Sequence, residues 1–497
     1  MSSPTPAYDA VAATYTRLHH FGHLQSLASW DQSANMPAKG NEARAAALAE
    51  MAALLHRMRT DPALAAQIER AEQEPLSELQ RANLREVGRD WRSANALPES
   101  LVQRRQLATA RCEHAWRSQR PANDWAGFLS HFGDVLAVAR EEATLLAAQT
   151  GLSRYDALMD QYEPGMRTAV VDRLFGDLRQ WLPGLIRQAR ERQAGERVIE
   201  PTGPFAVAAQ RALCEQVMGV LGFDFDAGRL DVSAHPFCGG VPEDVRLTTR
   251  FAEHSFIGSL MGTIHETGHG RYEQNLPRAL LGQPVAQARS SALHESQSLS
   301  FEMQLGRHPG FVQRLAPLLS ASFGSQPAFD AQNLHRLLTR VRPGLIRVDA
   351  DEVTYPAHVI LRYEIERALI EGEIEAADIP ALWDEKMMDL LGVDSRGNHK
   401  DGALQDVHWP AGLFGYFPCY TLGAMYAAQW FAALRRDLPD LDARIGRGDL
   451  APLFNWLRER IWSAASRWTT DELAQRASAE ALNPAHYRAH LEARYLG

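Results

Sequence analysis

The most informative stretch of the chain reads Ser255-Phe-Ile-Gly-Ser-Leu-Met-Gly-Thr-Ile-His265-Glu266-Thr-Gly-His269-Gly-Arg-Tyr-Glu-Gln274. Apolar residues recur on several sides of this stretch, which predicts a buried helix. Histidines with H-E-x-x-H spacing lie on one helix face, one turn apart, where both imidazoles can bind a single Zn²⁺. Glu266 lies beside them, where it can take a proton from a water on the metal. The spacing therefore predicts a metal centre on His265 and His269, with Glu266 as the catalytic base.

A catalytic zinc site needs a third protein ligand and an open position. After a joint that contains Pro277 and Pro284, a second predicted helix contains Ser291-Ala-Leu-His294-Glu295-Ser-Gln297. Glu295 is the leading candidate for the third ligand, from a helix packed antiparallel to the first, and His294 is the alternative. Adjacent helical residues point about 100° apart, so only one of the two can face the metal.

Three glycines, Gly262, Gly268 and Gly270, lie in the first predicted helix. Glycine weakens a helix, so its use here indicates that another backbone or a substrate approaches closely. The alternative interpretation of the motif is a pair of hydrogen-bonded histidines in a helical core.

Most of the remaining chain has the pattern of amphipathic helices separated by short polar joints. Clear examples are Glu42–Met58, Pro75–Ala94, Pro98–Arg117 and Asp124–Gln149. Between Arg197 and Arg250 the pattern changes, and three short strands are predicted at Val198–Pro201, Arg229–Ser233 and Val245–Thr249. We expect one mainly helical domain over 1–497. Within it, 1–195 would form one wall of a groove, 196–250 a small β region, and 251–497 the helical half with the metal.

The composition excludes several chemistries. Only three of the 52 basic residues are lysines, and none follows a glycine, so the Gly-Lys-Ser/Thr core of a P-loop is absent. A formal net charge of −9 disfavours nucleic acid, because affinity for nucleic acid rests on neutralising phosphates. The four cysteines form no C-x-x-C pair, which favours reduced thiols in a cytoplasmic protein.

Two segments bear on membrane association. The start, Met1-Ser-Ser-Pro-Thr-Pro6, has neither the basic nor the apolar region of a signal peptide. Ala411–Leu434 contains no charged residue and is long enough to span a bilayer. Its proline, glutamine, tyrosines and glycines favour a buried core segment, so we expect no membrane association.

Together, these features resemble the carboxypeptidase Taq family of zinc metallocarboxypeptidases, and the resemblance runs along nearly the whole chain. The motifs that carry it, in chain order, are Trp30-Asp-Gln-x-x-x-Met36-Pro37, Tyr155-Asp-Ala-Leu-Met-Asp-Gln-Tyr162-Glu-Pro-Gly-Met166, His235-Pro-Phe237, Asp244-x-Arg246-x-Thr248, His265-Glu-Thr-Gly-His269-Gly-Arg-Tyr-Glu-Gln274, His294-Glu-Ser-Gln297, Ile346-Arg-Val-Asp-Ala-Asp-Glu352 and Gly402-x-x-Gln405-Asp-x-His408-Trp409. Each motif is weak alone, and their shared order is specific.

The resemblance implies a helical, homodimeric fold with a deep groove, similar to neurolysin and angiotensin-converting enzyme. It implies His265, His269 and Glu295 as ligands of one Zn²⁺, which Co²⁺ can replace, and Glu266 as base. The implied activity is release of C-terminal amino acids, with broad specificity, from peptides that have a free C-terminus.

The related peptidases also direct a histidine and a tyrosine at the zinc, and here His408 and Tyr420 are the favoured pair. Tyr416 is a further candidate for substrate contact, although either tyrosine could instead be a core residue with a satisfied hydroxyl. His235, in the His-Pro-Phe loop, is another candidate for substrate contact, and its alternative is a turn histidine.

An exopeptidase must recognise a free carboxylate, which arginine binds bidentately. Arg347 is the first candidate because it lies in the family-like Ile-Arg-Val-Asp-Ala-Asp-Glu block. Arg246 is the second candidate, and its alternative is an ion pair with Asp244 that holds the β region.

Two other functions remain open at this point. An endopeptidase or dipeptidyl carboxypeptidase could use the same zinc helix. A helical scaffold with a relic metal site is the other alternative, and the intact Glu266 argues against it, because a scaffold needs no base.

Overall fold

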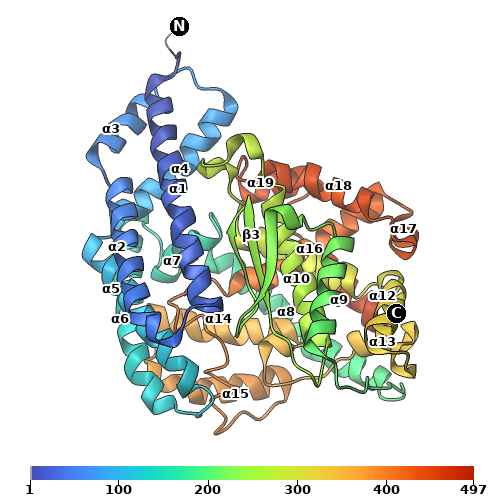
Figure 1. The fold of residues 1–497 in the computed structure, drawn as a ribbon. Helices are drawn as coiled ribbons and strands as arrows, with labels where there is room; N and C mark the ends of the chain where they lie inside the picture. The colour runs from blue at the N-terminus through green and yellow to red at the C-terminus, as the bar shows by residue number, and fades with distance from the viewer. Residues whose placement is uncertain (1–2) are drawn as a thin grey trace.

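A computed structural model describes residues 3–497. The blue helices of the N-terminal part lie along the left side of Figure 1, and a small sheet lies near the middle. Of the later part of the chain, the yellow and red helices lie on the right and the orange helices lie along the bottom. The predicted mainly helical class with a small sheet beside the metal-binding helix is confirmed. The finer division at 195 and 250 stays a prediction.

The part of the chain before the sheet is built from helices, and the four that the sequence predicts most clearly are all present. The helices are α1 (Pro6–Ala34), α2 (Asn41–Arg59), α3 (Pro62–Ala71), α4 (Glu78–Ala96), α5 (Glu99–Gln119), α6 (Trp125–Thr150), α7 (Arg154–Tyr162), α8 (Thr168–Gln193) and α9 (Val207–Val220). Helix α4 begins three residues later than predicted, because a capping box sets its start: the Ser77 hydroxyl accepts from the Gln80 backbone, and the Gln80 side chain accepts from the Ser77 backbone.

The sheet has the order β1-β3-β2, with strands β1 (Gly228–Val232), β2 (Cys238–Val241) and β3 (Asp244–Thr249). Strand β3 pairs parallel to β1 and antiparallel to β2. Two predicted strands are confirmed, but Val198–Pro201 is wrong: the Asn333 side chain pairs with the backbone N–H and C=O of Ile199, in place of a neighbouring strand. The sequence pattern misses β2 because this strand contains two adjacent glycines, which lower strand propensity.

After the sheet the chain is again helical, and the first helix of this part contains the H-E-x-x-H stretch. The helices of this part are α10 (Ile257–Gln274), α11 (Ser291–Leu299), α12 (Pro309–Phe323), α13 (Ala331–Leu338), α14 (Tyr355–Glu371), α15 (Ile379–Leu391), α16 (Pro418–Asp437), α17 (Leu441–Arg447), α18 (Ala451–Arg460), α19 (Thr470–Ser478) and α20 (Ala485–Tyr495). Helix α11 continues into a π-helical turn, η5 (Ser300–Gly306). Strand β3 ends just before α10, and the Thr249 hydroxyl bonds to the Ser259 carbonyl 3.3 Å away, which ties this helix to the sheet.

The uncharged stretch within Ala411–Leu434 forms most of α16, whose side chains are buried along nearly its whole length. Among residues 3–497, no helix is both long and apolar enough to cross a membrane. The expectation of a buried core segment is therefore confirmed for this stretch.

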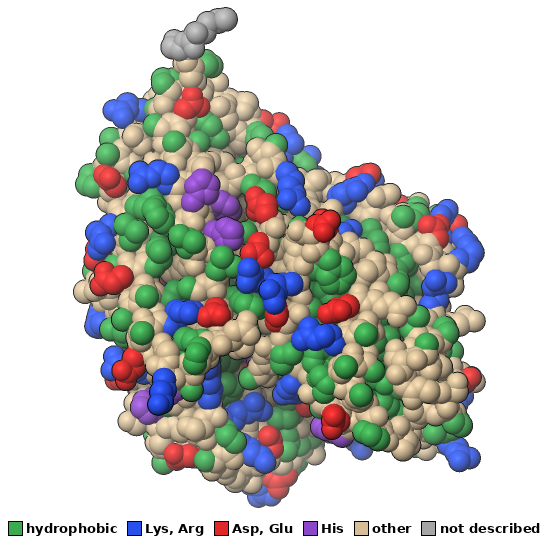
Figure 2. Space-filling model, viewed as in Figure 1, with side chains coloured by type: hydrophobic (Ala, Val, Ile, Leu, Met, Phe, Trp, Pro, Cys, Tyr) green, Lys and Arg blue, Asp and Glu red, His purple; other side chains and the backbone are tan. Residues whose placement is uncertain are grey.

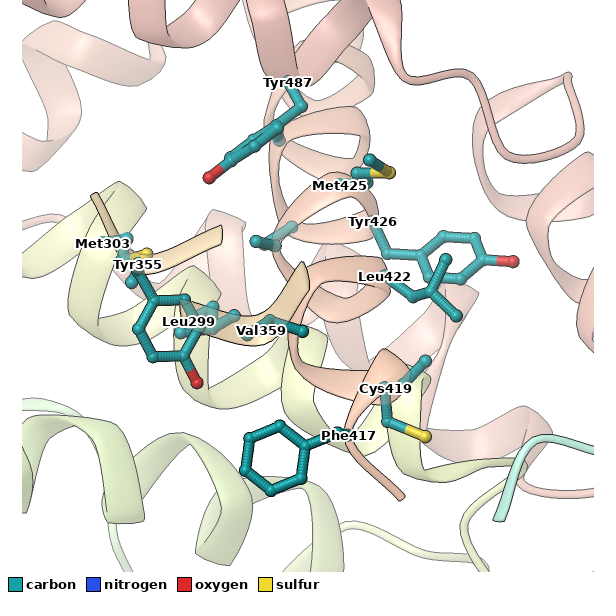
Figure 3. Close-up of a cluster of buried hydrophobic side chains, with 14 of the residues drawn as sticks. Leu299, Met303, Tyr355, Val359, Phe417, Cys419, Leu422, Met425, Tyr426 and Tyr487 are labelled. Atoms are coloured by element: carbon teal, nitrogen blue, oxygen red, sulfur yellow. The ribbon is translucent and has the colours of Figure 1, made fainter. Parts of the chain in front are cut away.

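The largest apolar core brings together parts of the chain that are distant in sequence. Figure 3 shows side chains from α11 and η5, from α14, from α16 and from α20 in one cluster: Leu299, Met303, Tyr355, Val359, Phe417, Cys419, Leu422, Met425, Tyr426 and Tyr487. A second, separate cluster packs the first four helices on one another. Leu260, Met261 and Ile264 of the helix that carries the H-E-x-x-H stretch belong to the same main core.

On the face drawn in Figure 2, basic and acidic side chains are interspersed. Many of the arginines pair with neighbouring carboxylates at the surface, as Arg104 does with Glu141 and Arg117 with Glu113. These helix faces form solvated surface.

Candidate metal centre

His265 and His269 of α10 and Glu295 of α11 meet at one point between these helices. One ligand atom from each residue lies within 4.8 Å of the other two, and within the described part of the chain no other set of His, Cys, Asp or Glu meets that criterion. His269 Nε2 lies 3.3 Å from Glu295 Oε2, and His265 Nε2 lies 3.7 Å from Glu295 Oε1. The structure therefore brings together the three residues that were predicted as ligands.

Two glycines allow the helices to approach so closely. A Cβ atom on Gly268 would lie 2.5 Å from the Gln297 carbonyl oxygen of α11. On the other side of α11, a Cβ on Gly423 of α16 would lie 2.7 Å from Glu295 Cβ. Real Cβ atoms do not approach other atoms this closely, so both positions require glycine. The expected close neighbour of the first helix is confirmed at Gly268, and it is the backbone of α11.

The donor set fits a divalent cation. Two imidazoles and one carboxylate form a common set of protein ligands in catalytic zinc sites. Glu295 is 2% exposed and Glu266 is 6% exposed, and within the described residues Glu295 Oε1 and Glu266 Oε2 have no hydrogen-bond partner. Burial raises the pKa of the Glu266 carboxyl to about 7, and the neighbouring Glu295 carboxylate adds to this effect. A cation between these groups would supply the positive charge that they lack.

A carboxylate lies against Nδ1 of His265, the ring nitrogen that faces away from Glu295. Glu302 of η5 lies with Oε2 2.9 Å from His265 Nδ1, and Arg307 donates to Glu302 Oε1 over 2.8 Å. The sequence analysis does not identify Glu302. Its spacing from Glu295 is a usable signal, because seven residues span nearly two helical turns and return to the same face.

A different group supports His269. Its Nδ1 lies 2.6 Å from Nδ1 of His294, whose Nε2 lies 2.7 Å from Glu273 Oε1. His294, the alternative third ligand, thus faces a ligand histidine and lies outside the group of three. Glu273 is also missed by the sequence analysis, although it follows His269 by one helical turn and therefore shares its face.

The residues predicted to stabilise the reaction lie on the segment that leads into α16. His408 Nε2 and the Tyr420 hydroxyl are 2.8 Å apart, and Tyr416 stacks on the His408 ring at 5.8 Å between centroids. Burial, with the charge of Glu295 adding to it, raises the pKa of Tyr416 and Tyr420, so both hydroxyls stay protonated and able to donate. His235 lies edge-on to His408 at 6.4 Å, so the structure brings these four predicted residues together.

Asp406 connects this segment to two buried arginines. It accepts from Arg347 Nε and Nη2, both at 3.0 Å, and from Arg362 Nη1 at 3.4 Å. Burial alone would raise the pKa of Asp406, but the two guanidinium groups hold it well below its usual range. The third nitrogen of Arg347 donates to Tyr355, and the guanidinium lies 4.6 Å from the ring centre of Tyr420. All three nitrogens of Arg347 are thus engaged within the protein, a fact the sequence pattern does not reveal.

Arg246 is also paired. It donates to both oxygens of Asp244 at 3.0 and 2.9 Å, and it lies over the Trp30 ring of α1 at 4.9 Å. This is the geometry of its alternative role, in which the pair holds the β region, here against the first helix.

A cavity of about 660 Å³ is lined by Glu273 and His294, the residues that support His269, and by none of the three candidate ligands themselves. Its walls come from α1, α4, β2, α10 and α11, and Glu273 and His294 lie on the wall nearest the metal group.

Comparisons with known proteins agree with this arrangement. Residues 10–495 match the family model described as carboxypeptidase Taq (M32) metallopeptidase. The chain is 39% identical to thermostable carboxypeptidase 1 of Thermus thermophilus, over 99% of both chains. It is 32% identical to carboxypeptidase 1 of Bacillus subtilis, over 96% of both. Metallocarboxypeptidase 1 of Trypanosoma cruzi has a similar structure, with a TM-score of 0.95 and 50% identity over 99% of this chain and 100% of that chain.

Proposed function

Because the chain belongs to the carboxypeptidase Taq (M32) family of metallopeptidases, we propose that it is a zinc-dependent carboxypeptidase with broad specificity for the C-terminal residue. The family establishes a metallocarboxypeptidase, a hydrolase that acts on peptide bonds. The observation that supports the zinc site is the convergence of His265, His269 and Glu295 beside a buried Glu266 with an unpaired oxygen. Co²⁺ is expected to replace zinc.

In the proposed mechanism, His265, His269 and Glu295 would hold the metal, which would supply Lewis-acid activation of the attacking water and the scissile carbonyl. Glu266 would take the proton of this water and pass it to the leaving amine. Tyr420, oriented by its hydrogen bond with His408, donates to the oxyanion that develops on the carbonyl. Tyr416 and His235, whose rings lie against His408, are proposed to contact the substrate.

The position of Arg347 changes its proposed role. A substrate carboxylate would have to compete with Asp406 for the same two nitrogens. We therefore place Arg347 as a positioning residue for Tyr420 and keep direct carboxylate binding as its alternative. Arg347→Ala separates the two roles through its kinetics: loss of positioning mainly lowers kcat, whereas loss of an anchor mainly raises KM for free-carboxylate peptides. The melting temperature should fall in either case, because the variant loses the buried ion pair with Asp406.

The activity is tested with an N-blocked dipeptide and its C-terminal amide. We expect hydrolysis of the free acid only, loss of that hydrolysis with a chelator, and recovery with Zn²⁺ or Co²⁺. Equal hydrolysis of the amide would favour the endopeptidase alternative, and hydrolysis that survives complete metal removal would contradict the proposed mechanism.

The assembly and the location are further proposals that rest on the family resemblance. We propose a homodimer in the cytoplasm, and light scattering on the purified chain measures the first directly. The cysteines of the described residues are all free thiols, which supports a reducing compartment.

A further inference from the structure

The two histidines of the candidate metal centre are supported in different ways. Nδ1 of His265 faces a carboxylate, Glu302, which is itself held by Arg307. Nδ1 of His269 faces another imidazole, that of His294. Ligand histidines usually donate to a carboxylate, a carbonyl oxygen or a water, so the second arrangement needs its own explanation.

The short contact between His269 and His294 defines where the protons lie. Nδ1 atoms 2.6 Å apart can share only one hydrogen. The Nε2 of His269 faces Glu295 and has to be free of hydrogen to bind a metal, so the hydrogen lies on its Nδ1 and is donated to His294. His294 accepts with Nδ1 and therefore carries its own hydrogen on Nε2. That atom lies 2.7 Å from Glu273 Oε1, the acceptor that this tautomer requires.

We propose that His294 and Glu273 form a relay that fixes the tautomer and the orientation of the metal ligand His269. The inference rests on the proposed metal site. Glu273 orders His294, and His294 orders His269, so the two residues act in series and do not contact the metal. Helix geometry makes the relay compact, because Glu273 is one turn from His269 on α10 and His294 is next to Glu295 on α11.

The relay also differs from the Glu302 support in its exposure. The side chains of His294 and Glu273 are 22% and 24% exposed and line the large cavity, whereas Glu302 and Arg307 are 16% and 9% exposed. One ligand histidine is therefore oriented by a mostly buried ion pair, and the other by two residues on the wall of the large cavity.

Metal affinity tests the relay without any substrate. We expect His294→Phe, which keeps a ring without nitrogens, to weaken Zn²⁺ and Co²⁺ binding by about 10–100-fold in competition with a chromophoric chelator. Glu273→Gln should weaken binding in the same direction and by less. Both variants should also change the visible spectrum of the Co²⁺ form, and the melting temperature of the metal-free protein should stay unchanged.

A double variant tests the arrangement in series. Once His294→Phe has broken the relay, adding Glu273→Gln should have no further effect on affinity, whereas Glu302→Gln should add its full effect, because it supports the other histidine. Glu253→Gln and His254→Phe are matched controls, since both side chains are exposed just before α10, and they should leave affinity unchanged.

Two results would overturn the relay. If His294→Phe and Glu273→Gln both bind metal within about twofold of the unaltered chain, the pair does not orient His269. If the two substitutions weaken binding additively, they act independently and not in series. An unaltered chain that binds neither ion would instead overturn the metal site, which the hydrolysis experiment would show separately.

Discussion

The helix pair α10–α11 and the segment 406–420 face the same site, but they are held in place by different means. In the helix pair, His265, His269 and Glu273 follow one another at one-turn intervals, and Glu302 follows Glu295 by nearly two turns, so regular helix geometry spaces them. In the segment, no periodicity links Asp406, His408 and Tyr420, and two buried arginines from elsewhere in the chain fix it through Asp406. The difference indicates that substitutions at the functional groups of the helix pair should lower catalytic activity with little effect on stability. Substitutions that break the ion pairs of the segment should lower both activity and stability.

The largest expected effect lies in the helix pair. Glu266→Gln keeps the shape of the side chain but removes the base, so kcat should fall by about 10²–10⁴-fold. Metal content, measured by elemental analysis, should stay the same because Glu266 is not a ligand. A variant that retains the parent activity would contradict the role of Glu266 in the mechanism.

The next largest effect is a loss of kcat on substitution of Tyr420, in the segment 406–420. Tyr420→Phe removes one proposed donor to the oxyanion, and we expect kcat to fall by about 10²–10³-fold at unchanged metal affinity. Tyr426→Phe, on the same helix, is the matched control: its buried hydroxyl has no partner within the described residues, so its removal should leave steady-state kinetics as they are. Equal kinetics for both variants would remove Tyr420 from the reaction.

Asp406→Asn tests whether buried ion pairs hold the segment 406–420 in place. The substitution leaves Arg347 and Arg362 buried without a counter-charge, and breaking such a buried pair costs about 3–5 kcal/mol. Chemical denaturation should show this loss, together with reduced kcat. Asp394→Asn is the control, because the Asp394–Arg396 pair is exposed and its loss should not change stability. Full stability of Asp406→Asn would show that the segment is held by its apolar contacts alone.

The smallest expected effect is a pH-dependent change in stability at Glu163, which contacts the start of α11. Glu163 accepts from the Ala292 backbone at the start of α11, and burial raises its pKa to about 7. A carboxyl whose pKa is raised on folding contributes stability that is present below its ordinary pKa and is lost as pH rises through the folded value. The loss therefore develops between about pH 4.5 and 7 and amounts to at most about 3 kcal/mol.

Glu163→Gln removes this dependence, because an amide does not ionise. The melting temperature of the variant relative to that of the unaltered chain should rise between pH 5 and pH 8, as measured by differential scanning fluorimetry. A constant difference across this range would show that Glu163 keeps an ordinary pKa in the folded protein.

Particular residues show how far the sequence predicts the molecule. Helices α2, α4, α5 and α6 follow from apolar periodicity to within about three residues. The strand at Val198–Pro201 does not form because the Asn333 side chain, more than a hundred residues away in the chain, takes the place of a strand. Strand β2 was missed because its pairing with β3 outweighs the low strand propensity of its two glycines.

The sequence by itself determined the centre of the site. The spacing of His265, Glu266 and His269 places their side chains through helix geometry, which is local and does not depend on the remainder of the chain. The order of the short motifs was also sufficient to identify the family.

Only the tertiary structure decided the contacts between distant segments. It brings Glu295 and not His294 into the group of three, because close packing of α11 against Gly268 and Gly423 fixes the rotation of that helix. It also engages Arg347 with Asp406, a partner that no local pattern predicts. In both cases the physical reason is the same: the outcome depends on which buried surfaces and charges meet after the helices pack, and that information is spread over the whole chain.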